Sequence, residues 1–449
     1  MALRTPSTDF FRPEVSEQII DKVRRQLFGW EAPSESTSEA NSLELLKRGY
    51  AQHLSQRALA GGKATQWLEN FLAAMALFPF VTIWFARYLW ARSRAIERRV
   101  DTIVFQYQPH VRNLVEGIRG NSSVLYLGSR RAELAPGDIG FLLNLLLQFP
   151  RCLLDFPFLL KVTFGIAYYS FVIRGYLPRE IIDFHEHSCS ASVQTAYCRA
   201  KGVKHVNMMH GDRAFVAEYA FVTFDEFHVW GNYYRDLFSS LYAPADQFRI
   251  TGNPLHRYLY HDLRGKPPSD WRQNCLLIFY ETIMTPSGPY LYLLSGLLTE
   301  IPEDWYVVMR KRALRSHEVD SSGAFVEALN RRLCEVGRRP IAIEHEADRP
   351  IQDSIRSARA VVGVYSTALL DAWVAGRKVI RLKSNRHGFY IPEEPYVRSR
   401  NVFTYDEDSV LGDFLHRDFL LSPEEDALLN HISHQGAVRE QGTDALVSR

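Results

Sequence analysis

Short β-rich runs alternate with helical segments over most of the chain beyond about residue 101, and this alternation restricts the fold more than any other feature. The first series contains DTIVFQY, SVLYLG, IIDFHEHS and KHVNMMHG, with helical segments such as HVRNLVEGIRG and QTAYCRAKG between them. A second series begins after about residue 260 and contains NCLLIFYE, DWYVVMRKR, PIAIEHE, AVVGVY and KVIRL. Strands that alternate with helices form parallel βαβ units. We therefore expect an α/β protein with two Rossmann-like, doubly wound domains.

Changes in hydropathy and in expected secondary structure along the chain predict its domain organisation. The N-terminal part is helical and partly apolar, and its polar stretch 29–42 has the composition of a loop or a disordered insertion. We expect a helical, partly apolar N-terminal extension at 1–100, a Rossmann-like domain at 101–260 with an apolar helical insertion at 141–173, a second Rossmann-like domain at 261–432, and a flexible tail at 433–449.

Charge and cysteine content exclude several classes of protein. The chain has 53 basic and 51 acidic residues and a formal net charge of +2, so no strongly basic surface for nucleic acid is expected. The five cysteines lack metal-ligand spacing, and the N-terminus lacks a cleavable apolar signal. These features predict a reduced, cytoplasmic protein without nucleic acid as a partner.

Two apolar stretches stand out, at 71–85 and 141–175. The first is too short for a bilayer core, and charged residues interrupt the second, so we expect neither to cross a membrane. Two interpretations remain open. The stretches are buried core helices, or they lie in the interface of an anionic leaflet with Trp84 and Trp90 and the basic cluster of Arg92, Arg94, Arg98 and Arg99 at the headgroups. The second interpretation predicts a peripheral protein on the inner face of the plasma membrane.

Titratable residues follow two strands of the first series. His210 and Gly211 are the last two residues of the run KHVNMMHG. His185, Glu186 and His187 lie near the end of the run IIDFHEHS. Ligands of doubly wound sheets sit beyond the carboxyl ends of the strands. Acid and base groups from neighbouring strand ends therefore form a candidate catalytic site, with His210 or Glu186 as general base and His187 nearby. The alternative is that each histidine is structural.

The second series offers candidate phosphate ligands. Ser366 and Thr367 stand where AVVGVY turns into a helix, so their hydroxyls and the first helical N–H groups can hold phosphate oxygens; ordinary helix capping is the alternative. Asp371 lies one turn further on, where it can reach a ribose hydroxyl or simply favour the helix N-terminus. Arg310 and Lys311 follow another strand and can neutralise a leaving phosphate, unless they are a basic surface run.

The stretch ITGNP ends a strand with a tight turn. Gly252 and Asn253 allow unusual backbone angles, which let a ligand approach the main chain closely. We place both residues at the nucleotide site, with a purely geometric turn as the alternative.

The order of AKGVKHVNMMHG, FDEFHVWGNYYRDLF, FRITGNPLHRY and YSTALLDAWVAGRKVIRL resembles the two-Rossmann (GT-B type) bacterial glycosyltransferases that build capsules, lipopolysaccharide and related surface polymers. It is similar also to the poly(glycerol phosphate) transferases of that architecture. The resemblance covers about residues 100–390. One departure is that YVVMRKRALRSHE has no His-Pro pair after its strand, which leaves the donor contact made there by many relatives without an equivalent.

This resemblance implies two domains facing each other across a cleft and an inverting glycosyltransferase activity. The first domain supplies the base and binds a glycan or lipid-linked glycan acceptor, and the second holds a nucleotide-sugar donor. No metal or other cofactor is expected, since relatives generally dispense with a metal and no DxD element ends a strand. Two alternatives stay open: a nucleotide-sugar epimerase of the same fold, and a non-catalytic, membrane-associated assembly protein.

Overall fold

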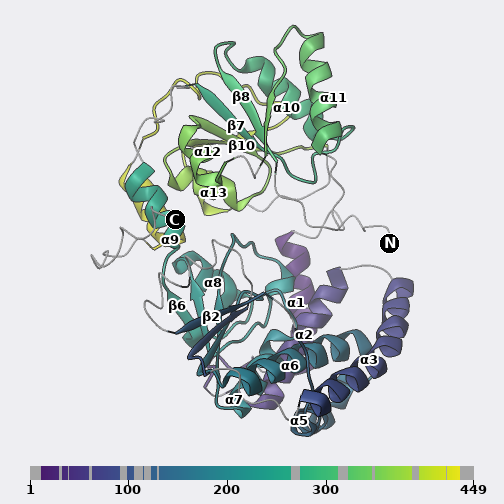
Figure 1. The fold of residues 1–449 in the computed structure, drawn as a ribbon. Helices are drawn as coiled ribbons and strands as arrows, with labels where there is room; N and C mark the ends of the chain where they lie inside the picture. The colour runs from purple at the N-terminus through teal and green to yellow at the C-terminus, as the bar shows by residue number, and fades with distance from the viewer. Residues whose placement is uncertain are drawn as a thin grey trace. The chain divides into compact units, whose positions relative to one another are not determined.

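The computed structural model describes residues 12–29, 33–38, 40–59, 63–91, 99–105, 115, 123–128, 131–263, 274–311, 322–345, 349–386, 394–420 and 422–434. The chain divides into two compact units, one of Met1–Thr251 with Val438–Arg449 and the other of Gly252–Ala437. Each unit is built around its own sheet (Figure 1). Most of the predicted helix at 110–120, and residues 435–449 of the predicted tail, lie outside the described residues.

The first unit contains a six-stranded sheet in which every neighbouring pair is parallel. Its spatial order is β2-β1-β3-β4-β5-β6. Strands β1, β4 and β5 are buried at every position except Lys204, as expected of parallel strands covered on both faces. The bounds are β1 Thr102–Phe105, β2 Val124–Leu127, β3 Glu180–Asp183, β4 Lys204–Met208, β5 Glu226–Val229 and β6 Phe248–Ile250.

The N-terminal helices pack onto this unit. Helix α1 contacts α2, α2 lies against α7, and α3 packs along α6, which itself contacts α7 (Figure 1). Residues 1–100 thus contribute helices to the layer around the sheet. The bounds are α1 Pro13–Phe28, α2 Ser42–Leu59, α3 Lys63–Ala91, α5 Pro136–Gln148, α6 Phe156–Tyr176, α7 Ala191–Ala200 and α8 Asn232–Ser240, with short 3-10 segments at Pro150–Cys152, Ala217–Tyr219 and Ala245–Gln247.

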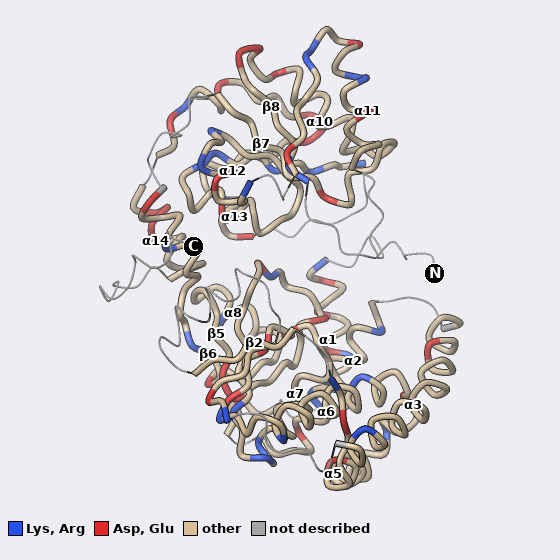
Figure 2. Tube along the Cα trace, viewed as in Figure 1, with Lys and Arg blue, Asp and Glu red and all other residues tan. Residues whose placement is uncertain are grey.

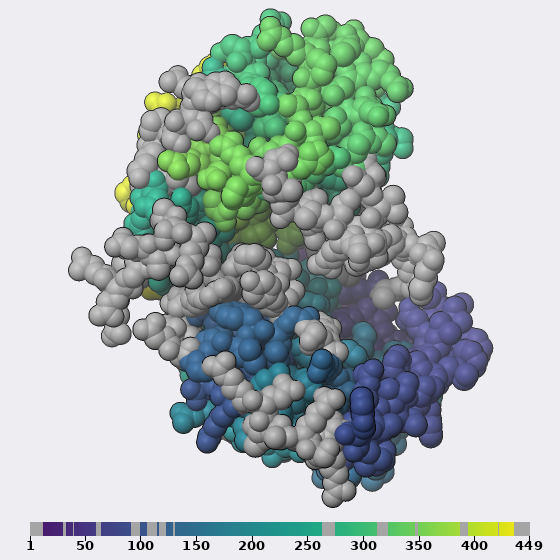
Figure 3. Space-filling view, in the orientation of Figure 1, coloured from purple at the N-terminus to yellow at the C-terminus, as the bar shows by residue number. Residues whose placement is uncertain are grey.

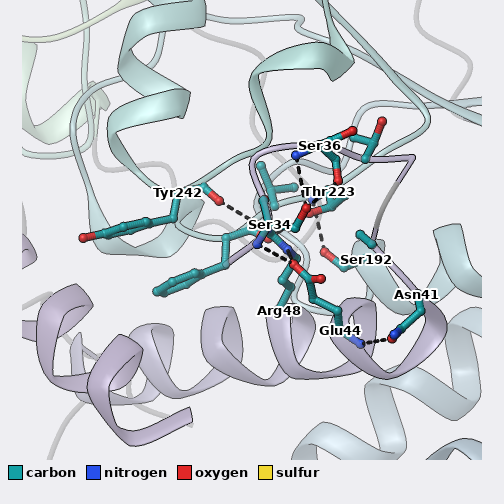
Figure 4. A network of polar contacts seen from close by, with 12 residues as sticks. Ser34, Ser36, Asn41, Glu44, Arg48, Ser192, Thr223 and Tyr242 are labelled. Atoms are coloured by element: carbon teal, nitrogen blue, oxygen red, sulfur yellow. Dashed lines mark hydrogen bonds and ion pairs between the residues drawn. The ribbon is translucent and has the colours of Figure 1, made fainter. Parts of the chain in front are cut away.

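A buried arginine fastens the segment before α2 to this unit (Figure 4). The side chain of Arg48 is fully buried, and its Nε donates to Glu44 Oε1 at 3.0 Å while its Nη1 donates to the carbonyl of Tyr242 at 2.7 Å. The amide of Ser34 donates to the same Glu44 oxygen at 2.9 Å. The polar stretch 29–42 was expected to be a loop or disordered; its described residues 33–38 form a loop held by these bonds.

The second unit also contains six parallel strands, in the order β12-β11-β10-β7-β8-β9. Leu294 and Leu297 of α10 and Phe325 of α11 pack with Ile278 and Val362 of the sheet in its core. The strands are β7 Cys275–Phe279, β8 Tyr306–Arg310, β9 Ala342–Glu344, β10 Ala360–Gly363, β11 Lys378–Leu382 and β12 Val402–Tyr405; the helices are α9 Pro254–Tyr258, α10 Pro289–Glu300, α11 Ser322–Glu335, α12 Ile351–Ser357, α13 Thr367–Val374 and α14 Pro423–Ile432, with a π segment at Leu259–Leu263 and a 3-10 segment at Pro395–Arg398.

The predicted fold class of two Rossmann-like, doubly wound domains with apolar N-terminal helices is confirmed by these two sheets. The two sheets differ in strand order, and each order indicates where a ligand would bind. The first unit follows the flavodoxin-like order, in which the winding reverses between β1 and β3, whereas the second follows the order of the dinucleotide-binding fold, in which it reverses between β7 and β10. Ligands of such sheets bind at the carboxyl ends of the strands beside the reversal.

Helix α3 is longer than the sequence suggested. It extends over 29 residues, about 44 Å at 1.5 Å per residue, so the expectation that this region is too short for a bilayer is wrong. Two segments, Ala64–Trp90 and Phe156–Tyr176, are long and apolar enough to cross a membrane by length and composition alone. The sequence argument saw only the apolar centre of α3 and not the helical residues that flank it.

The two long helices differ in burial. In the apolar window of Phe156–Tyr176, 67% of residues are buried, whereas in that of Ala64–Trp90 only 11% are buried. Figure 3 shows α3, in purple-blue, at the surface, and the helix carries charge only at Lys63, Glu69 and Arg87 (Figure 2). Helix α6 is therefore a core helix, while α3 exposes apolar side chains: Trp67, Phe71, Met75, Phe78 and Trp90.

Candidate functional site

The structure brings His210 and Glu186 together at the carboxyl edge of the first sheet. Strands β3 and β4 are neighbours in register, with Asp183 opposite Asn207, so the residues that follow them lie side by side. His210 Nδ1 is 4.0 Å from Glu186 Oε1. The ring of His210 also meets the ring of Phe184 edge-on, with centroids 5.7 Å apart. This is the pair that sequence reasoning had placed at neighbouring strand ends.

Glu186 is fully buried and strongly held. Arg213 Nε donates to Glu186 Oε1 at 2.5 Å and Arg213 Nη2 forms an ion pair with the same oxygen, while Asn207 Nδ2 donates to Oε2 at 3.3 Å. Burial acts to raise the pKa of Glu186, but the charges of Arg213 and His210 outweigh it and the pKa falls to about 2. Glu186 is thus ionised at neutral pH, and both of its oxygens already accept hydrogen bonds from Arg213 or Asn207. A carboxylate with so low a pKa is a poor general base at neutral pH.

His210 is better suited to exchange a proton. About a quarter of its side chain is exposed, and Nδ1 faces the buried cluster, 3.5 Å from Arg213 Nη2. Glu186 Oε1, at 4.0 Å from the same nitrogen, is close enough to form an ion pair with a protonated ring. The geometry therefore separates the two candidates: His210 is partly exposed, whereas Glu186 is a buried, ion-paired carboxylate.

His187 is close enough to this cluster for its charge to contribute to the lowered pKa of Glu186. Its side chain is exposed, and its ring contacts that of His185 at a centroid distance of 5.8 Å. His185 Nδ1 pairs with the buried Asp183, whose other oxygen accepts a hydrogen bond from Tyr169 at 2.8 Å. Both histidines line a cavity of about 340 Å³ beside β1 and β3. His187 therefore lies between the surroundings of the buried Glu186 and this cavity.

In the second unit, Ser366 and Thr367 lie beside the reversal of strand order between β7 and β10. Ser366 is the N-cap of α13, and its hydroxyl accepts a hydrogen bond from the amide of Ala368 at 3.3 Å. The carboxylate of Glu281, directly beyond β7, accepts from the amides of Val364 and Tyr365 at 2.8 and 2.9 Å. The capping alternative for Ser366 is thus observed, and the site adds an acidic residue that the sequence did not single out.

Two other predicted donor residues are engaged within the protein. Asp371 Oδ1 is 2.8 Å from His256 Nε2 in a buried pair. Arg310 is 4% exposed and donates to Ser354 Oγ and to the carbonyl of Arg349, both at 2.7 Å, and it also pairs with Glu344. These contacts give both side chains structural partners, and their predicted contacts with ribose and phosphate stay predictions.

The remaining predicted donor residues occupy backbone positions. Gly252 has φ of +72°, and a Cβ there would lie 2.2 Å from the carbonyl oxygen of His434, so close chain approach alone requires glycine. Asn253 caps α9, because its Oδ1 accepts from the amide of Leu255 at 3.0 Å. Lys311 continues β8 through a main-chain bond from its amide to the carbonyl of Glu344 at 2.9 Å.

The site also contains residues that sequence reasoning missed. Arg213 comes three residues after His210 in HGDR, and its importance follows from the buried Glu186 that it holds, a contact 27 residues distant in sequence. Glu281 ends the run NCLLIFYE, and its position beside β10 follows from the strand order alone. Within the described part of the chain, no group of three or more His, Cys, Asp or Glu residues is arranged to hold a metal ion.

Comparison with known proteins yields structural likeness only. A scan of family models and a search of curated proteins found no match. Anabaena HepE in complex with UDP and glucose aligns at 10% identity and a TM-score of 0.40, covering 75% of this chain and 96% of that one. A UDP-N-acetylglucosamine 2-epimerase aligns at 12% identity and a TM-score of 0.44, covering 75% and 92%.

The wall teichoic acid polymerase TagF aligns at 11% identity and a TM-score of 0.42, covering 84% of this chain and 95% of that one. At these sequence identities and TM-scores, the likeness does not indicate an activity. The fold class rests on the two parallel sheets themselves.

Proposed function

We propose that the protein is an inverting glycosyltransferase that moves a sugar from a nucleotide-sugar to a hydroxyl of a glycan or lipid-linked glycan. The observation that carries the proposal is the position of His210, a partly exposed imidazole at the carboxyl end of β4, over the buried carboxylate of Glu186. Such a pair is suited to removing a proton from a hydroxyl.

In the proposed reaction, the acceptor oxygen attacks the anomeric carbon as its proton passes to His210 Nε2, and the bond to the nucleotide phosphate breaks. Glu186 stabilises the resulting imidazolium. Arg213 keeps Glu186 ionised through the contacts that lower its pKa. The phosphate leaves with the electron pair of the broken bond.

The donor is assigned to the second unit. The reversal of strand order between β7 and β10 marks the usual ligand position in a sheet of this order. Ser366 and Thr367 begin α13 there, and a helix N-terminus attracts phosphate. Glu281 reaches the same loop, so we assign its carboxylate to the ribose side of the nucleotide.

The exposed helix α3 supports a membrane location for this activity. Its apolar residues lie on the surface, and the basic run that contains Arg92, Arg94 and Arg98 follows it in the sequence, outside the described residues. Apolar side chains with adjacent cations suit an anionic leaflet. We place the protein on the cytoplasmic face of the plasma membrane, in the synthesis of a surface polysaccharide.

A nucleotide-release assay tests the activity. The protein is incubated with UDP-, GDP- and CMP-sugars and CDP-glycerol, with and without a detergent extract of bacterial glycolipids, and nucleotide and sugar products are separated by chromatography. A transferase releases nucleotide faster when acceptor is present. An epimerase would interconvert the donor sugar without acceptor, and a non-catalytic protein would do neither; either result contradicts the proposal.

A further inference from the structure

A cavity of about 340 Å³ lies entirely within the first unit, beside the carboxyl ends of β1 and β3. Its wall combines Phe105 and Asp183, the last residues of β1 and β3, with part of one face of α6 and the residues directly before α7. The winding of this sheet reverses between β1 and β3, which is where doubly wound sheets bind ligands. Its volume falls within the range of small-molecule sites.

Gln194 lines this wall, and its amide oxygen is a buried acceptor. The residue is 7% exposed, and its Oε1 has no hydrogen-bond partner among the described residues. The side chain lies against the backbone of α6 at Gly165, where a Cβ would come 2.6 Å from Gln194 Nε2. A buried amide oxygen without a partner costs free energy unless a ligand donates to it. A hydroxyl group of a ligand supplies such a donor.

The cavity also favours negative charge. Lys161 of α6 lines it and forms no hydrogen bond or ion pair with any described residue. The hydroxyls of Ser188 and Ser190, 2.9 Å apart, stand at the N-terminus of the ten-residue helix α7, whose first N–H groups carry partial positive charge. The acidic side chain in the wall, Asp183, is already paired with His185.

Aromatic rings complete the wall and connect it to α3. Phe105 packs against Tyr168 and Tyr169 at centroid distances of 4.4 and 4.9 Å. Phe164, at the same wall, contacts Trp84 of α3 at 5.6 Å. The cavity is therefore next to the helix that exposes apolar side chains, and a ligand attached to a lipid has an apolar surface beside it.

We propose that this cavity binds an anionic, hydroxyl-bearing sugar unit, with a hydroxyl donating to Gln194 Oε1 and a phosphate or carboxylate facing Lys161 and the start of α7. The proposal rests on the proposed function, because it makes this unit the part of the acceptor that positions the attacking hydroxyl near His210. The same chemistry occurs in soluble sugar phosphates and in the headgroups of phosphate-linked lipids.

Equilibrium binding tests the proposal without any donor or turnover. Full-length protein is titrated with glucose 1-phosphate, with glucuronate and with uncharged glucose, and saturation is followed by calorimetry and ligand-observed NMR. We expect both anions to bind saturably and glucose to bind at least tenfold more weakly. Lys161→Met should weaken the anions about tenfold or more, as expected for a lost charged hydrogen bond, whereas Lys161→Arg should retain them.

Further variants make the test specific to this cavity. Gln194→Leu and Gly165→Ala should each weaken binding, the second by pushing the amide of Gln194 aside, while Lys22→Met removes an exposed lysine of α1 and should change nothing. Thermal melting checks that each variant is folded. Absence of saturable binding by both anions, or equal binding to wild type and Lys161→Met, would overturn the proposal.

A competition experiment distinguishes the two sources of ligand. Vesicles of phosphatidylcholine with phosphatidylglycerol that displace glucose 1-phosphate from wild type indicate a lipid headgroup, and vesicles that bind without displacing it indicate a soluble sugar phosphate. If the anions fail to bind but acceptor still stimulates nucleotide release, the cavity proposal is wrong and the transferase proposal stands. If the anions bind but no nucleotide is released, the transferase proposal is wrong and the cavity still binds an anionic sugar.

Discussion

His210 and Glu186 are both candidates for the general base in the sequence, but their surroundings in the structure differ. Both residues follow neighbouring strands of one sheet. Glu186 is nevertheless fully buried and bonded to Arg213, whereas His210 is partly exposed. The difference arises from contacts with Arg213 and Asn207, 27 and 21 residues away in sequence. A general base needs a lone pair that the substrate can reach, and of these two side chains only the imidazole of His210 is partly exposed.

The low pKa of Glu186 predicts a specific loss of stability in acid. Its folded pKa, about 2, lies below the usual 4.5, so its ionisation stabilises the fold fully above about pH 4.5 and progressively less as the pH falls towards 2. The contribution is on the order of 3 kcal/mol. Urea unfolding from pH 7 to pH 3 should therefore show a steeper decline for wild type than for Glu186→Gln. Parallel declines in the two proteins would refute this assignment.

At the scale of elements, the sequence predicted the two parallel sheets because apolar runs of four or five residues alternate with helices. It also placed His210 and Glu186 at adjoining strand ends, since parallel neighbours end at one edge. It did not predict the partners of Arg310 and Asp371, which depend on loops and helices that come together only in the fold. Hydropathy likewise failed to separate α3 from α6, because exposure depends on packing partners.

Helix α3 predicts membrane binding through its exposed aromatic side chains. Phe78 and Trp90 are 82% and 78% exposed, and burying a large apolar side chain stabilises binding by about 1.5–3 kcal/mol. Replacing both with serine should weaken sedimentation with vesicles containing phosphatidylglycerol by tenfold or more, and neutralising the basic cluster should weaken it further. Val410→Ser, a similarly exposed apolar residue of the second unit, serves as the control. Wild-type protein that stays in the supernatant would contradict the membrane proposal.

At the scale of the whole molecule, the account divides the work between two Rossmann-like units with different strand orders. The first unit contains the cavity beside β1 and β3 and also His210, to which we assign the role of base, and the second contains the loop before α13, to which we assign the nucleotide. Each candidate site lies at the carboxyl ends of strands in its own sheet. This division means that removing the base in one unit should leave nucleotide affinity in the other unchanged.

The most direct test of the account measures sugar transfer and nucleotide affinity in the same His210→Asn protein, with Glu186→Gln alongside. Asparagine is close in size to the part of the ring near Nδ1 but accepts no proton, so we expect transfer to fall by roughly 100-fold or more while the nucleotide Kd stays at the wild-type value. Glu186→Gln should lower transfer less, since it removes the support and not the proton acceptor. Normal turnover by a folded His210→Asn protein would contradict the account.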